Sequence, residues 1–340
     1  MNKDELMKTA KAMVAPGKGI LAADESSGTI KKRFDSILVE STEENRRFYR
    51  ELLFTTPGME EFISGVILYD ETIRQKSKDG TSLPDVLVKK GVLPGIKVDK
   101  GAKMLAGSDQ EKVTEGLDGL RERFIEYYTL GARFSKWRAV ITIGDGIPTD
   151  YCISVNAHAL ARFAALSQEA NIVPIVEPEV LMDADNTIEI CEQVTEKTLL
   201  AVFDELKKQR VFIEGIILKP NMVISGKKCS TQATSKQIAE STLRCFKKVL
   251  PKELPGVVFL SGGQSEVEAT VNLNEMNKTA PHPWELSFSY GRALQQSALK
   301  TWSGKPENAK AAQDAFFKRA KFNGLARLGN YKSEMEKLNH

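Results

Sequence analysis

Short apolar segments recur along the 340-residue chain, and each is only long enough for one strand. Such runs, bounded by polar or turn residues, are typical of strands that are buried on both faces. Segments with a 3.6-residue period fill most of the gaps and predict helices there. The eight expected strands lie within residues 17–24, 62–70, 93–99, 134–144, 171–180, 214–221, 256–263 and 284–291.

Helix start signals support this alternation. Ser41 and Glu44 have the spacing of a capping box at the start of a helix. Residues 1–14 predict an amphipathic packing helix at the N-terminus, and a last helix is expected after Pro306. The polar residues from about 328 to 340 are expected to form a mobile tail.

Eight alternating strand and helix units predict an α/β fold, the (β/α)8 TIM barrel, as a single domain over residues 1–340. A doubly wound sheet is the alternative, but it would show fewer strands and a phosphate fingerprint after the first one. Gly17 and Gly19 precede the first strand, so they do not form that fingerprint.

Composition narrows the class of protein. The 48 basic and 45 acidic residues nearly balance, so no global field favours nucleic acid or a membrane surface. The four cysteines form no CxxC pair and fit reduced thiols in the cytoplasm. The three histidines lack metal-ligand spacing, which argues against a metal-dependent lyase or hydrolase. No segment resembles a signal peptide or a membrane span.

Charged residues stand at the carboxyl end of almost every expected strand. Side chains two apart share a face, and helices cover the outside of a barrel strand, so these charges must point inward. Barrel enzymes carry their sites at this rim. Structural ion pairs are an alternative, although burying many charges is costly unless each is matched. The residues are Asp24, Asp70, Lys97, Asp99, Lys136, Arg138, Glu177, Glu179 and Lys219.

Lys219 ends the apolar segment EGIILKPNM, where a proline stops the strand. Taken alone, it could simply extend into solvent. Among the other rim charges, partial burial and the positive charge of Lys136 favour its neutral amine. Such an amine attacks a carbonyl carbon to form a Schiff base, and Glu177 and Glu179 are placed to move the protons.

Two glycine-rich turns are suited to phosphate. SGGQSEVEA places Gly262 and Gly263 before a helix, and SYGRAL places Gly291 and Arg292 in a similar way. Each glycine alone could merely start a helix. A third candidate follows the first strand, with Ser26, Ser27, Thr29, Lys31, Lys32 and Arg33. Two such turns flanking an amine indicate a bisphosphorylated carbonyl compound.

The segments LAADESSGTI, GIKVDKG, KWR, IVPIVEPE, LKPNM, FLSGGQSE and FSYGRALQ stand in an order and spacing that resembles class I fructose-bisphosphate aldolase, from Leu21 to about Trp302. The resemblance implies a Schiff-base lyase of glycolysis and gluconeogenesis. Its substrate would be fructose 1,6-bisphosphate, cleaved to dihydroxyacetone phosphate and glyceraldehyde 3-phosphate. It also implies a cytoplasmic homotetramer that uses no metal or organic cofactor.

The same resemblance assigns residue roles. Lys219 would form the imine with the C2 carbonyl, and Glu177 would be the general acid and base. Lys136 and Glu179 would tune charge and proton transfer, and Asp24 would bind the C4 hydroxyl. The 1-phosphate residues would be Ser261, Gly262, Gly263, Ser289, Gly291 and Arg292. The 6-phosphate residues would be Ser26, Thr29, Lys97 and Arg33, and Arg138 joins the substrate-binding set.

The C-terminal segment departs from the family pattern. Family members typically end in a tyrosine that assists proton exchange, whereas this sequence ends in Leu338-Asn339-His340. Tyr331 is not an obvious substitute. The preference between bisphosphate and monophosphate substrates therefore stays open. A second binding role, as a scaffold or cytoskeletal adaptor, also stays open.

Overall fold

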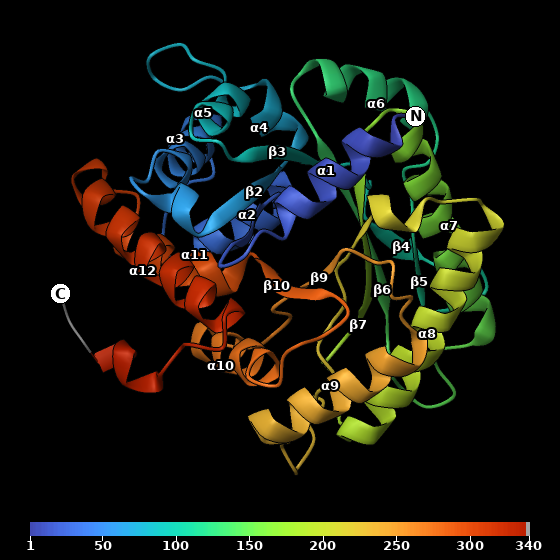
Figure 1. The fold of residues 1–340 in the computed structure, drawn as a ribbon. Helices are drawn as coiled ribbons and strands as arrows, with labels where there is room; N and C mark the ends of the chain where they lie inside the picture. The colour runs from blue at the N-terminus through green and yellow to red at the C-terminus, as the bar shows by residue number, and fades with distance from the viewer. Residues whose placement is uncertain (338–340) are drawn as a thin grey trace.

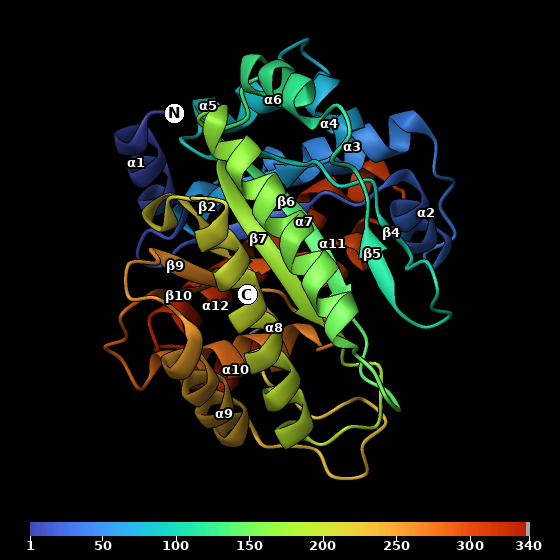
Figure 2. The same cartoon turned by 90° about the vertical axis from the view of Figure 1, so that its right-hand side faces the viewer.

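Eight parallel strands form a closed barrel, which confirms the predicted architecture (Figures 1 and 2). The computed structural model describes residues 1–337. Around the barrel the strand order is β1-β10-β9-β8-β7-β6-β3-β2, and β2 pairs with β1 to close it. The strands are β1 (Gly19–Ala23), β2 (Ile63–Leu68), β3 (Leu93–Lys97), β6 (Phe134–Ile141), β7 (Val173–Val180), β8 (Ile217–Leu218), β9 (Gly256–Phe259) and β10 (Glu285–Tyr290).

Helices surround the barrel on its outside (Figure 1). The α-helices are α1 (Lys3–Met13), α2 (Ser27–Asp35), α3 (Glu43–Phe54), α4 (Asp70–Arg74), α5 (Leu83–Lys89), α6 (Leu120–Thr129), α7 (Asp150–Glu169), α8 (Ile188–Lys208), α9 (Ser235–Val249), α10 (Glu266–Asn277), α11 (Arg292–Trp302) and α12 (Ala309–Arg327). Short 3-10 turns are η1 (Met59–Glu61), η2 (Ile213–Gly215), η3 (Pro306–Asn308) and η4 (Ser333–Lys337). Within residues 1–337, no helix is both long and apolar enough to cross a bilayer.

Helix α1 closes the end of the barrel at which the strands begin, its amino-terminal end. Leu6, Ala10 and Met13 of this helix pack into one buried cluster with the side chains inside the barrel, including Phe134. The Ser64 hydroxyl donates a hydrogen bond to the Met13 carbonyl at 2.6 Å and thereby anchors the end of the helix. The polar rim therefore lies at the opposite end, beyond the carboxyl ends of the strands.

The structure corrects one local expectation and adds one element that was not expected. The capping box at Ser41 and Glu44 is wrong, because Thr42 is the N-cap and accepts a hydrogen bond from the Asn45 amide at 3.1 Å. An antiparallel hairpin of β4 (Ala102–Met104) and β5 (Lys112–Thr114) was not predicted. Its strands are only three residues long and three of the six residues are exposed, so they are too short to show a hydrophobic pattern.

The C-terminal segment contacts the body of the protein as far as Glu336. Tyr331 is buried, and its amide donates to Asn274 Oδ1 at 2.9 Å. Its hydroxyl donates to Glu336 Oε1 at 2.8 Å, and Glu336 also pairs with Arg319 at 2.5 Å. The mobile tail was expected to span residues from about 328 to 340. Its last three residues, 338–340, lie outside the described residues.

Candidate active site

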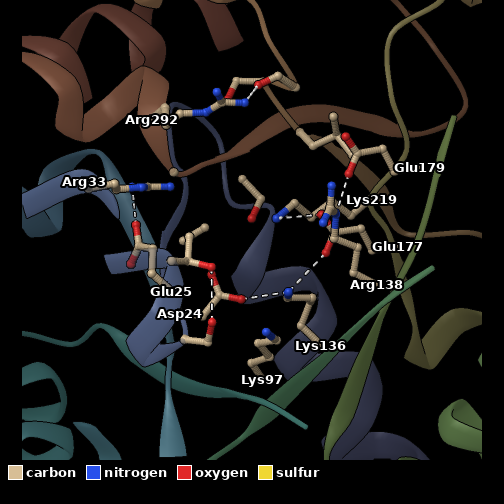
Figure 3. A pocket seen from close by; sticks show the side chains of 18 of the residues that line it. Asp24, Glu25, Arg33, Lys97, Lys136, Arg138, Glu177, Glu179, Lys219 and Arg292 are labelled. Carbon is tan, nitrogen blue, oxygen red and sulfur yellow. Dashed lines mark hydrogen bonds and ion pairs between the residues drawn. The ribbon is translucent and has the colours of Figure 1, made fainter. Parts of the chain in front are cut away.

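A cavity of about 470 Å³ opens at the carboxyl ends of the barrel strands (Figure 3). Every residue to which the family resemblance assigns a role lines it, with the exception of Gly263. The lining residues are Ala22, Asp24, Glu25, Ser26, Thr29, Lys32, Arg33, Ser36, Lys97, Lys136, Arg138, Glu177, Glu179, Lys219, Leu260, Ser261, Gly262, Ser289, Gly291 and Arg292.

Strand alternation delivers the paired charges of β6 and β7. Lys136 and Arg138 lie on the inner side of β6, while Trp137 between them points outward and stacks on Phe163 of α7, with ring centroids 5.7 Å apart. In the register between the two strands, Arg138 stands beside Glu177. The period of two thus places four charged side chains from two strands in one cavity.

Lys219 directly follows β8, and its amide donates to the Val176 carbonyl at 2.8 Å, which fixes its position beside β7. The side chain is buried, and its Nζ lies 3.2 Å from Glu177 Oε1 (Figure 3). The immediate partner of the predicted nucleophile is therefore a carboxylate. The proton of Lys219 has an acceptor within direct reach.

Lys136 is the centre of a buried ion network. Its Nζ lies 2.7 Å from Asp24, 3.4 Å from Glu177 and 3.9 Å from Asp99. Burial alone would lower the pKa of Lys136, but these carboxylates outweigh it and hold the pKa above its ordinary value. Lys136 therefore stays protonated, and its charge is matched by carboxylates.

The same network keeps two carboxylates ionised. Burial would raise the pKa of Asp24, but Lys136, Lys219 and Lys97 outweigh it and hold it well below its usual range. Burial would likewise raise the pKa of Glu177, yet Lys219, Lys136 and Arg138 together hold it below its usual value. Asp24 and Glu177 are therefore ionised and can accept protons.

Glu179 has a different partner. Its carboxylate accepts a hydrogen bond from Arg138 Nε at 2.5 Å. Burial would lower the pKa of Arg138, but the charge of Glu179 outweighs it and raises the pKa. Glu179 thus holds the Arg138 guanidinium at the rim, while Glu177 faces Lys219 (Figure 3).

One side of the cavity carries a cation that has no ion-pair partner within residues 1–337. Arg292 donates to the Gly262 carbonyl, and within residues 1–337 it forms no ion pair with a carboxylate. Burial lowers the pKa of Arg292, and the nearby charge of Arg33 acts in the same direction. The Ser289 hydroxyl is buried without a hydrogen-bond partner in this part of the chain. These groups offer a cation and a donor to an anionic ligand.

The opposite side of the cavity is formed by α2 and the end of β3. Ser26 Oγ and Thr29 Oγ1 lie 3.1 Å apart, and Lys97 Nζ lies 3.6 Å from Asp99. Arg33 forms an ion pair with the buried carboxylate of Glu25 (Figure 3). Hydroxyls and cations are therefore gathered here as well, and the Arg33 guanidinium reaches from here toward Gly291 and Arg292.

Some candidates lie elsewhere, and others were missed. Lys31 pairs with Asp35 on the exposed side of α2, at 2.8 Å. Asp70 pairs with Arg74 at 3.0 Å and does not line the cavity. Glu25 and Ser36 line the cavity but were not among the sequence-based candidates. Lys32, which was named as part of the charged stretch after the first strand but given no role, lines it as well. The helical spacing of residues 29, 32, 33 and 36 would have identified this face of α2.

The family model for class I fructose-bisphosphate aldolase matches residues 5–340 of the chain. The chain belongs to this family. It is therefore a carbon–carbon lyase of the Schiff-base type.

Similar aldolases come from both bacteria and unicellular eukaryotes. The probable class 1 fructose-bisphosphate aldolase of Xanthomonas campestris is 59% identical over 98% of this chain and 100% of that protein. Fructose-bisphosphate aldolase 1 of Toxoplasma gondii is 56% identical over 96% of this chain and 91% of that protein. A solved structure of the Plasmodium falciparum aldolase, in complex with TRAP and a small-molecule inhibitor, has a TM-score of 0.96 at 52% identity and covers 97% of this chain and 96% of that one.

Within residues 1–337, no group of three or more histidine, cysteine, aspartate or glutamate side chains is arranged to hold a metal ion. The carboxylates of the cavity are instead matched by lysine and arginine. The chemistry of the rim is therefore that of an amine, its carboxylate partners and two anion-binding sides.

Proposed function

We propose that Lys219 is the imine-forming residue of this aldolase and that it acts on the C2 carbonyl of fructose 1,6-bisphosphate. The observation that carries the proposal is the buried contact of 3.2 Å between Lys219 Nζ and Glu177 Oε1, inside a cavity with cationic groups on two sides. A ketose with a phosphate at each end matches that arrangement in charge and in position of the reactive carbonyl.

The imine forms in two steps. Glu177 accepts a proton from Lys219, and the lone pair on Nζ attacks the C2 carbonyl carbon to give a carbinolamine. Glu177 then returns the proton to the carbinolamine hydroxyl, which leaves as water. The product is a protonated imine whose positive nitrogen withdraws electrons from C3. Lys136 stays cationic throughout and holds the neighbouring carboxylates in place.

Cleavage requires a base at the C4 hydroxyl. Asp24, which is ionised and lies 2.7 Å from Lys136, binds this hydroxyl, and Glu177 accepts its proton. The C3–C4 bond then breaks, its electron pair moves to C3 and the imine nitrogen, and glyceraldehyde 3-phosphate leaves. The remaining enamine takes a proton at C3, and water hydrolyses the imine to release dihydroxyacetone phosphate.

The phosphates occupy the two cationic sides. Ser261, Gly262, Ser289, Gly291 and Arg292 are proposed to bind the 1-phosphate, because this side holds an uncompensated guanidinium and an unpaired hydroxyl. On the other side, Ser26, Thr29, Arg33 and Lys97 are proposed to bind the 6-phosphate. Arg138 binds the substrate between them, held by Glu179.

Borohydride trapping tests this proposal. Reduction in the presence of dihydroxyacetone phosphate should add the sugar to the peptide that contains Lys219, and a Lys219→Met variant should lose both the adduct and the activity. Lys228→Met is the matched control, because Lys228 is an exposed lysine further along the same connection between β8 and α9, and this variant should behave as wild type. Label on another lysine would refute the assignment. Activity should also survive EDTA.

We also propose that this aldolase assembles as a homotetramer in the cytoplasm. The free cysteines Cys152, Cys191 and Cys245 are buried, as expected of thiols kept reduced. Ile125 of α6 and Leu200 of α8, the helices on either side of α7, are exposed apolar side chains. Light scattering after size exclusion should give four times the mass of one chain, and cell fractionation should place the protein in the cytoplasm.

An adaptor role is a second proposal. The structure of the similar Plasmodium falciparum protein contains TRAP, so a homologous surface of this chain is a candidate for binding another protein. A pull-down with the inactive Lys219→Met variant separates such binding from catalysis. Equal capture by the variant and wild type would support a role that is independent of turnover.

A further inference from the structure

The glycine turn after β9 is covered by a methionine. Met182, in the loop after β7, places its Sδ 2.9 Å from the Gly263 amide, which donates to it. This explains why Gly263 does not line the cavity although Gly262 does. A thioether is a weak acceptor, so the bond holds the amide only loosely.

Lys227 lies against the same turn. A methyl group built on Gly263 would come within 2.0 Å of Lys227 Cε and 2.1 Å of its Nζ, so the end of this side chain lies directly against the glycine. The ammonium pairs with Asp183 at 3.0 Å, and both side chains are substantially exposed. Exposed pairs of this kind contribute little stability, so the lysine can exchange its partner at low cost.

The loops that carry these residues are hydrogen-bonded to each other. The Lys227 amide donates to the Met182 carbonyl at 2.7 Å, and the Lys228 amide donates to the Ala184 carbonyl at 3.0 Å. The charge of Asp183 also reaches Arg292 across the turn. Met182 and Lys227 are thus held together at the edge of the side proposed for the 1-phosphate.

We propose that Met182 and Lys227 form an exchange pair that controls binding of a phosphate monoester at the 261–263 turn. The phosphate oxygen takes the Gly263 amide from the Met182 sulfur, and the Lys227 ammonium leaves Asp183 to bind the same phosphate. An anionic oxygen is a far stronger acceptor than a thioether, which drives the first exchange. A dianion also attracts the ammonium more strongly than one exposed carboxylate does, which drives the second.

The inference rests on the proposed function and predicts opposite effects for the two residues. Lys227→Gln removes a ligand for the phosphate and should weaken binding. Met182→Leu keeps the bulk but removes the competing sulfur, so it should tighten binding. Both effects should vanish for dihydroxyacetone, which has the reactive carbonyl but no phosphate.

Trapping with cyanoborohydride measures these effects as the probe concentration that gives half-maximal labelling of Lys219. Lys227→Gln should raise this concentration for dihydroxyacetone phosphate by roughly threefold to tenfold, and Met182→Leu should lower it by about twofold to threefold. Values for dihydroxyacetone should match wild type. Lys228→Gln is the control for a lost surface charge and should show no shift.

Two results would overturn the exchange pair. One is a Lys227→Gln shift that equals that of Lys228→Gln or appears equally with dihydroxyacetone. The other is unchanged phosphate-dependent labelling in Met182→Leu. If wild type shows no label at Lys219, the proposed function fails instead. Calorimetric titration of inorganic phosphate then still decides the inference, because it needs no imine: Lys227→Gln must weaken that binding and Met182→Leu must strengthen it.

Discussion

Lys219 Nζ and Glu177 Oε1 lie 3.2 Å apart, with side chains that are 5% and 4% exposed. Each group is both the partner that stabilises the other's charge and the partner that can exchange a proton with it. The contact joins two strands that are separated by α8 in the sequence but lie adjacent in the barrel. Burial strengthens this interaction, because water cannot screen it.

Substitution of Glu177 by Gln should slow imine formation and cleavage together. The amide keeps the shape of the side chain but cannot accept or return the proton, so we expect kcat to fall by roughly 100-fold to 10,000-fold. Stopped-flow measurement of imine formation checks this. Glu196→Gln, which removes a surface partner of Lys248, is the control. A normal rate in Glu177→Gln would remove this residue from proton transfer.

Substitution of Arg292 by Gln should weaken binding at the 1-phosphate side. The guanidinium has no carboxylate partner within residues 1–337, so its charge is available to the ligand. Loss of one charge-assisted hydrogen bond predicts an increase in KM of roughly 10-fold to 100-fold. Steady-state kinetics with fructose 1-phosphate measures it. Arg121→Gln, on the exposed surface of α6, should leave KM unchanged.

Asp24→Asn should destabilise the protein in a pH-dependent way. The folded pKa of Asp24 lies below its ordinary value, so its stabilisation is present above about pH 4 and is lost as the pH falls further. The free energy of unfolding of the variant should be lower by about 3 kcal/mol at pH 7, because a buried partner of Lys136 is lost. The loss is no larger because Lys136 keeps two other carboxylates, Asp99 and Glu177.

Calorimetric Tm values between pH 3 and pH 7 test the sign. The difference between wild type and Asp24→Asn should be constant from neutral pH to about pH 5 and shrink near and below about pH 4. Asp35→Asn, which removes an exposed pair with Lys31, is the control and should change little. A difference that grows with acid would contradict the assigned charge state.

Gly95→Ala should disturb the closed end of the barrel. A methyl group there would lie 2.2 Å from Phe134 Cε2, so the buried ring would have to move. We expect a loss of about 1–3 kcal/mol in the free energy of unfolding, or more. Gly28→Ala is the control, since no atom lies within 4 Å and its helical site favours alanine. Denaturant titration of both variants decides the prediction.

Several features of the site follow from local patterns. The inward direction of Lys136, Arg138, Glu177 and Glu179 follows from the period of two in β6 and β7, and a closed barrel brings all strand ends to one rim. The four residues are therefore predictable without coordinates. The face of α2 that carries Lys32 and Ser36 is also periodic, but its orientation depends on packing against the barrel.

The sequence alone determined the eight-stranded barrel, the polar rim and most of the cavity residues, because strand period, chain order and the motifs shared with the family are all present in the sequence. Tertiary structure decided which charges meet: Lys219 faces Glu177, while Arg138 holds Glu179. It also decided that Met182 covers Gly263, a contact between loops 81 residues apart. Such pairings depend on rotamers and loop paths set by the whole packed interior, and no local pattern encodes them.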